Sequence, residues 1–128
     1  MPVGTVGQRY YLAMEHIAGR DLKSVLTRLD EMRKPLAPGL AIHVIAEVLE
    51  ALDYAHRRRH PVTQEPLNLI HRDISPQNVL VSFEGEVKII DFGLAKSTQR
   101  SQETQANVLL GNFGYMSPEQ ARGQALDV

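Results

Sequence analysis

The stretch from Pro38 to about Arg58 constrains the fold most, because it is long and keeps one helical period throughout. Its apolar residues recur at steps of three and four, which places them on one face of an α-helix. Pro38 suits the first turn of such a helix, where its missing N–H would have no intrahelical partner in any case. The apolar stripe consists of Ala41, Val44, Ile45, Val48, Leu49, Leu52 and Ala55.

Two shorter elements are predicted before this helix. Residues 9–15 (RYYLAME) mix aromatic and aliphatic side chains over the length of a strand. Asp21 can cap a helix, and the apolar residues within 22–29 recur at helical spacing. Residues 34–39 (KPLAPG) end that helix, because proline cannot continue the hydrogen-bond ladder. The predicted order before Pro38 is therefore a strand, a connector and a helix.

Short β-rich runs follow the long helix. Residues 60–68 (HPVTQEPLN) are rich in prolines and polar residues and predict a loop. The runs 78–82 (NVLVS) and 86–90 (EVKII) are predicted to form a hairpin, with Gly85 in its tight turn. Residues 117–122 (SPEQAR) predict a short helix that begins at a proline. The sequence therefore indicates an α+β fold.

The composition excludes several classes of function. The chain has 128 residues and a net charge of −1, which argues against nonspecific nucleic-acid binding. It has no cysteine, so disulfides and thiol chemistry are excluded. Charged residues interrupt every apolar stretch before a membrane span is reached, and the first residues lack a secretory pattern. We therefore expect a cytoplasmic segment that makes no membrane contact, while an anchor elsewhere in a longer protein stays open.

Four motifs occur along the chain in a recognisable order. They are residues 10–22 (YYLAMEHIAGRDL), 71–78 (HRDISPQN), 91–93 (DFG) and 111–120 (GNFGYMSPEQ). In this order the chain resembles the C-terminal lobe of a eukaryotic-type protein kinase, particularly the bacterial Ser/Thr kinases. Each triplet alone is weak evidence, whereas four motifs in the right order are strong. The match covers essentially the whole chain but only about half of a complete kinase domain.

The resemblance implies an incomplete kinase domain. Residues 1–18 would be the last strands of the N-terminal lobe and the hinge, and residues 19–128 a mostly helical part of the C-terminal lobe. The glycine-rich loop, its lysine and the C-terminal helices are absent from this sequence, so we expect them in the full-length protein and expect the fragment alone to be inactive. Apolar surface along Val44, Ile45 and Leu52 should then be exposed.

The resemblance also implies roles for three polar residues in an ATP- and Mg²⁺-dependent reaction on a protein substrate. Phosphoryl transfer mainly needs alignment of the reacting groups and neutralisation of phosphate charge. Asp73 would accept or orient the proton of the substrate hydroxyl. Asn78 and Asp91 would supply oxygen ligands to Mg²⁺. Capping and turn chemistry is the simpler explanation for each of these residues taken singly.

The other end of the nucleotide would meet the hinge. By resemblance, Met14 is the gatekeeper, and the backbones of Glu15 and Ile17 hydrogen-bond adenine. Asp21 would reach the ribose, and Leu80 would form the apolar floor beneath the base.

Further residues are assigned to packing and regulation. His71 and Phe92 resemble two members of a stacked apolar spine. Arg72 suggests control by phosphorylation, because a phosphate could pair with its guanidinium. The candidate phosphate acceptors are Ser97, Thr98, Ser101 and Thr104. A plain flexible loop over these residues is the alternative to a phosphorylated switch.

The sequence departs from the kinase pattern at two positions. Ser75 stands where most Ser/Thr kinases carry a lysine that steadies the γ-phosphate, so it is a catalytic position without charge. Asn112 replaces a threonine that normally bonds to the same unit. Loss of one charge-assisted bond in the transition state costs roughly 2–3 kcal/mol, or about 30- to 150-fold in rate.

These departures leave alternatives open. A noncatalytic, pseudokinase-like module that binds a partner is favoured by Ser75 and Asn112, whereas the presence of Asp73, Asn78 and Asp91 argues against it. A small-molecule phosphotransferase is disfavoured, because the long segment that ends in YMSPEQ suits a protein substrate.

Overall fold

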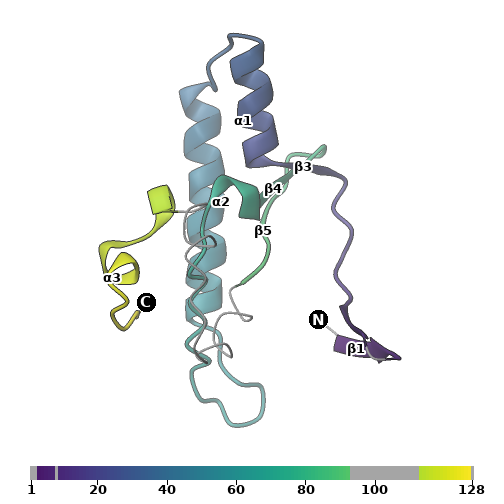
Figure 1. Cartoon of the computed structure of the whole chain (residues 1–128), viewed down its shortest axis with the longest axis vertical. Coiled ribbons are helices and arrows are strands. Elements are labelled where there is room, and N and C mark those ends of the chain that lie inside the picture. Colours follow the sequence, from purple (N-terminus) through teal and green to yellow (C-terminus); the bar gives the residue numbers. More distant parts are fainter. Residues whose placement is uncertain (1–2, 8, 93–112, 128) are drawn as a thin grey trace.

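The computed structural model describes residues 3–7, 9–92 and 113–127. Within them, short strands precede and follow two long helices (Figure 1). The strands are β1 (Val3–Val6), β2 (Arg9–Leu12), β3 (Gly19–Asp21), β4 (Val79–Ser82) and β5 (Val87–Ile89). The helices are α1 (Leu22–Glu31), α2 (Pro38–His56) and α3 (Pro118–Ala121), with 3₁₀ turns at Pro76–Asn78 and Phe113–Tyr115. The predicted α+β composition is confirmed for these residues.

Helices α1 and α2 begin and end close to where the sequence predicts. The Asp21 side chain caps α1, because its Oδ1 accepts a hydrogen bond from the Ser24 N–H at 2.8 Å. Helix α2 starts at Pro38 and ends at His56, two residues before the predicted end. Figure 1 shows α1 turning back into α2, so that the two helices run in opposite directions.

Strands β3, β4 and β5 form one antiparallel sheet in that order. The pairing Val79↔Ile89 and a positive φ of 92° at Gly85 confirm the predicted hairpin. Alternate residues of a strand face opposite sides of the sheet. Residues on one of these sides pack against α2. The core that results is built from Val44, Val48 and Val79, with Leu22, Leu52, Val87 and Ile89 packed against it.

The exposed face of α2 differs from the prediction. Val44 is 9% exposed and Leu52 packs against the core, so the expectation of exposure is wrong for both. The expectation of exposure is right for Ile45, which is 55% exposed. Ile42 (70% exposed) and Leu49 (59% exposed) are exposed on the same helix. The apolar stripe is wider than one contact surface: one flank meets the β-hairpin, and the other flank remains uncovered within the described residues.

The N-terminal residues form a hairpin, whereas the residue pattern predicts one strand and the resemblance implies more than one strand within residues 1–18. Strand β2 ends at Leu12, before the predicted end at Glu15, and pairs with β1 in the register Val3↔Leu12. The chain then runs through residues 13–18 to β3, and Figure 1 shows this hairpin standing apart from the helices. In the part of the chain that the structure describes, none of the helices combines the length and the apolar character needed to cross a bilayer.

Candidate active site

His71 organises the loop that carries the first candidate residues. Its side chain is 1% exposed, and its Nε2 lies 2.9 Å from the Ile90 carbonyl oxygen. The Asp73 N–H donates to Nδ1 at 3.3 Å, so the ring proton belongs on Nε2, where it donates to Ile90. The predicted contact with Phe92 is present, with the ring centroids 4.6 Å apart. His71 is therefore a buried structural residue that joins the loop to the chain after β5.

Asn78 is held in place by three hydrogen bonds. Its Nδ2 donates to the Asp73 carbonyl oxygen at 2.8 Å, and its backbone N–H donates to the Ser75 carbonyl oxygen at 2.9 Å. Its own carbonyl oxygen accepts a bond from the Ile90 N–H at 2.9 Å. Because the amide nitrogen is committed to the loop, the side-chain oxygen Oδ1 is the atom left to accept a ligand.

Asp91 follows Ile90 and lies at the same end of the hairpin as Asn78. Strands β4 and β5 are antiparallel, so the start of one meets the end of the other. Asp91 is exposed and has a φ of 57°, and Arg72 in the loop has a φ of 68°. Left-handed backbone costs a non-glycine residue of order 1–3 kcal/mol, and such residues cluster at functional sites. The hydrogen bonds of Asn78 therefore join Asp73 to Ile90, the residue that immediately precedes Asp91.

This unit offers ligands of the type that Mg²⁺ prefers. Asn78 can present an amide oxygen and Asp91 a carboxylate, and both are hard oxygen donors. Mg²⁺ is usually held by one or two carboxylates together with the phosphates of the substrate. The residues present therefore fit a magnesium ion bound together with a nucleotide.

Ser75 lies in the same loop, but its side chain is enclosed. It is 2% exposed, and its Oγ has no hydrogen-bond partner among the described residues. An unpaired buried hydroxyl costs roughly 1–3 kcal/mol, so the position is unfavourable unless a further group reaches it. The proposed catalytic role of Ser75 stays a prediction.

Residues assigned to the nucleotide's other end meet on one face of the sheet. Asp21 pairs with Leu80, and Leu80 pairs with Lys88, so the three side chains form one row across β3, β4 and β5. The Lys88 Nζ reaches the Glu15 Oε1 at 2.6 Å, which joins the hinge segment to this row. This hydrogen bond raises the pKa of the Lys88 ammonium.

The remaining hinge residues are more exposed. Met14 is exposed and Ile17 is half-buried. The Asp21 carboxylate is already engaged, because its Oδ2 accepts from the Ser24 hydroxyl at 2.6 Å and its Oδ1 accepts from the Ser24 N–H. These bonds hold the pKa of Asp21 below its usual range. Capping thus accounts for Asp21 without a ligand, and its contact with ribose stays a prediction.

Several predicted residues fall outside the described part of the chain. These are the regulatory candidates Ser97, Thr98, Ser101 and Thr104, together with Asn112. Arg72 lies within it and is exposed.

Among the described residues, the long-range side-chain contacts that the sequence did not predict include the following two. The first is the ion pair between Glu15 and Lys88. The alternation in EVKII indicates that Lys88 lies on the polar face of its strand, but not that Glu15 is its partner. The second is a hydrogen bond from the Gln120 side chain to the Arg72 carbonyl oxygen, for which the sequence gives no signal.

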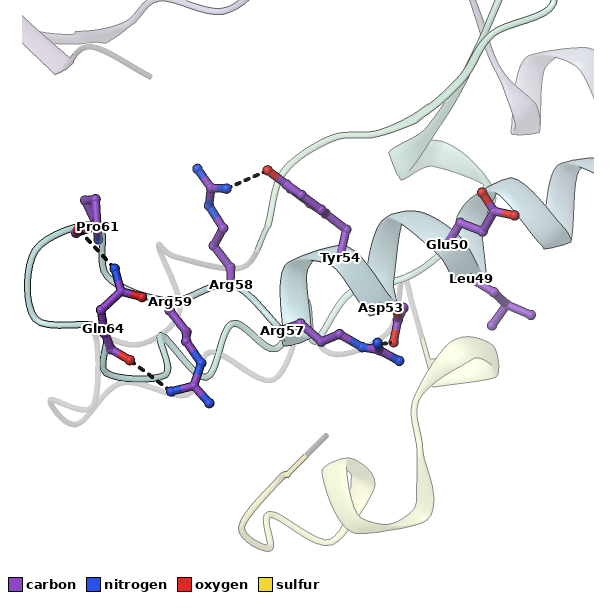
Figure 2. Close-up of a pocket in the computed structure, with 9 residues that line it drawn as sticks. All are labelled: Leu49, Glu50, Asp53, Tyr54, Arg57, Arg58, Arg59, Pro61 and Gln64. Atoms are coloured by element: carbon purple, nitrogen blue, oxygen red, sulfur yellow. Dashed lines mark hydrogen bonds and ion pairs between the residues drawn. The ribbon is translucent and has the colours of Figure 1, made fainter.

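An open hollow of about 870 Å³ lies at the C-terminal end of α2 (Figure 2). Arg57 pairs with Asp53 at 2.8 Å, and Arg58 donates to the Tyr54 hydroxyl at 2.7 Å. These pairings fit a solvated helix end, where basic residues complement the helix dipole. The lining residues are Leu49, Glu50, Asp53, Tyr54, Arg57, Arg58, Arg59, Pro61 and Gln64. None of them belongs to the candidate active site.

Comparisons with known proteins identify the family of this chain. Residues 3–128 match the family described as the protein kinase domain. The tyrosine-protein kinase MasK of Myxococcus xanthus is 38% identical over 118 residues, which are 92% of this chain and 18% of that protein. A probable serine/threonine-protein kinase, PknB of Lactococcus lactis, is 42% identical over 121 residues, 94% of this chain and 17% of that protein. PrkC, a serine/threonine-protein kinase of Bacillus subtilis, is 35% identical over 114 residues, 89% of this chain and 16% of that protein.

This chain therefore spans less than one fifth of the length of these relatives. The match to the family covers almost all of its residues, and the observed elements are those of an incomplete, α+β kinase-like fold. The chain belongs to the protein kinase family.

Proposed function

We propose that the protein containing this chain transfers the γ-phosphoryl group of ATP to serine or threonine hydroxyls of protein substrates. The observation that carries the proposal is the hydrogen-bonded unit of Asp73, Asn78 and Ile90, which holds the catalytic loop against the chain that leads into Asp91. Kinase chemistry depends mainly on positioning, and this unit supplies rigid positions.

Each residue of the unit has a separate task in this proposal. The Asp73 carboxylate orients the substrate hydroxyl and takes its proton. Asn78 contributes Oδ1 as an oxygen ligand, because its Nδ2 is engaged with the Asp73 carbonyl oxygen. Asp91 contributes its carboxylate from the segment that follows β5. When bound, Mg²⁺ would neutralise phosphate charge.

The choice of serine or threonine over tyrosine rests on the loop sequence. The residues after Asp73 read ISPQN and lack the Ala-Ala-Arg-Asn pattern of tyrosine kinases. Two of the relatives named above are called serine/threonine kinases, and one is called a tyrosine kinase. Analysis of which amino acid becomes labelled will decide between the two specificities.

Replacement of Asp73 by asparagine in the full-length protein tests the proposal. The wild-type protein should incorporate labelled phosphate into itself or into a generic basic protein. Asp73→Asn should abolish this labelling, because the amide cannot accept the hydroxyl proton. Asp53→Asn is the matched control: Asp53 lies on the exposed side of α2 and pairs only with Arg57 among the described residues, so labelling should be unchanged.

Labelling that survives in Asp73→Asn would remove Asp73 from its proposed role. A wild-type protein without labelling would favour the noncatalytic alternative, for which the uncharged and enclosed Ser75 is the specific observation.

A further inference from the structure

The short helix α3 makes a side-chain contact with the catalytic loop. The Gln120 Nε2 donates to the Arg72 carbonyl oxygen at 2.5 Å, across 48 positions of the sequence. Gln120 is half-buried, and the backbone of its helix is held locally. The Ser117 hydroxyl oxygen accepts from the Gln120 N–H at 3.2 Å, and the Gln124 N–H donates to the Glu119 carbonyl oxygen at 2.9 Å. The amide of Gln120 therefore extends from a capped helical turn rather than from an irregular segment.

The accepting carbonyl belongs to the peptide bond that immediately precedes Asp73. The N–H of the same peptide bond is that of Asp73, and it donates to His71 Nδ1 at 3.3 Å. Gln120 and His71 thus hold the two polar groups of one planar unit from opposite sides. The following peptide bond is held as well, because its carbonyl oxygen accepts from Asn78 Nδ2.

The strained backbone of Arg72 explains why this unit needs support. Its φ of 68° is left-handed, a conformation that an arginine adopts only when surrounding contacts compensate for the cost. Without the Gln120 bond, the 72–73 peptide could rotate toward an unstrained conformation. That rotation would turn the Cα–Cβ bond of Asp73, and a displacement of about 1 Å of a reacting group can cost about 100-fold in rate.

We propose that Gln120 is a positioning residue for the proposed phosphoryl transfer, acting through the 72–73 peptide bond on the orientation of Asp73. This inference rests on the proposed function. In this inference, the hydrogen bond from α3 connects the segment that contains Ser-Pro-Glu to the catalytic loop. Gln120 acts through Arg72 and is not itself placed against the nucleotide or the substrate.

The kinetic test uses full-length protein with Gln120→Met, which keeps the length of the side chain and removes the donor. The kcat should fall about tenfold, the value of one hydrogen bond of about 1.4 kcal/mol, while the KM for ATP stays within about twofold. Gln124→Met is the matched control on the same segment and should leave both constants unchanged. Gln120→Lys keeps a donor on a long side chain and should recover most of the lost kcat. Equal kcat values for the wild type and Gln120→Met would overturn the inference, provided that labelling by the wild type depends on Asp73.

A second measurement does not depend on activity. Hydrogen exchange of the amides in residues 71–78, followed by mass spectrometry, should become faster in Gln120→Met and stay unchanged in Gln124→Met. If the wild type transfers no phosphate, the proposed function fails, whereas faster exchange would still support the Gln120 link. Unchanged exchange in Gln120→Met would overturn the link whatever the activity of the protein.

Discussion

The catalytic loop and the hinge segment of this kinase chain are held in different ways. In the loop, His71 and Ser75 are buried, and hydrogen bonds from both sides hold the peptides around Asp73. In the hinge segment, residues 13–16 are exposed. Its long-range contacts include the Glu15–Lys88 ion pair and the bond from the Phe83 N–H to the Ala18 carbonyl oxygen.

This difference shows which of the two segments is held in position by contacts within the described residues. The hydrogen bonds around Asp73 are partly buried, so water weakens them less than it weakens exposed contacts, and losing one partner leaves the other unsatisfied. An exposed ion pair is screened by water and contributes little. The groups proposed to act on phosphate are therefore prepared by the fold, whereas the segment proposed to bind adenine is held only loosely by contacts within the described residues.

Asn78→Ala tests the catalytic-loop side of this comparison, and among the variants described below we expect it to have the largest effect. It removes a proposed ligand and the donor that holds the Asp73 carbonyl oxygen. We expect kcat to fall by roughly 10- to 100-fold, a loss typical of groups that support a metal site. Steady-state labelling by the full-length protein measures this change. Gln77→Ala, at an exposed neighbour in the same 3₁₀ turn, should stay within about twofold of the wild type. A loss of less than fivefold in Asn78→Ala would contradict the proposed role.

Elements that depend on contacts between residues close in sequence were predicted more accurately than those that depend on distant residues. Helix α2 was predicted to within two residues of its end, because its period repeats over many turns. The residue pattern alone did not predict strand β1, because VGTV has too few apolar residues to show a strand period. Its pairing with β2 depends on both segments together.

Tertiary contacts explain the remaining differences. Val44 and Ile45 belong to one apolar stripe, yet only Val44 faces the sheet, and the pattern does not say which flank will be covered. The order of the motifs predicts roles for Asp73, Asn78 and Asp91, whereas the contact of Gln120 depends on how α3 docks on the loop. Long-range docking leaves no periodic signal in a sequence.

Asp21→Ala should have an intermediate effect, on stability rather than catalysis. It removes the cap of α1 and should cost about 1 kcal/mol in the free energy of unfolding, measured with denaturant on the full-length protein. The bonds from Ser24 lower the pKa of Asp21, so its contribution is present above the ordinary pKa of an aspartate. It should be lost as the pH falls below about 4 toward the lowered folded value.

Asp21→Ser separates the cap from the proposed ribose contact. Serine is also a good cap, so stability should be largely retained. A rise in the KM for ATP without a loss of stability would then support contact with ribose. Unchanged KM values in both variants would leave Asp21 with its capping role alone.

Lys88→Met should have the smallest effect, because it acts on the exposed hinge. The variant keeps most of the apolar stem in β5 and removes the ion pair with Glu15. We expect the KM for ATP to rise about twofold with kcat unchanged, since exposed pairs contribute little and are weakened by salt.

Glu15→Gln should give the same change, and the double variant should add nothing further if the pair is the cause. Lys23→Met, at an exposed lysine of α1, is the control. Because the bond to Glu15 raises the pKa of Lys88, the part of the stabilisation that depends on the charged ammonium should be present below about pH 10. It should be lost as the pH rises through the raised pKa. A loss of kcat as large as that in Asn78→Ala would contradict the comparison, because the hinge would then be as strictly positioned as the catalytic loop.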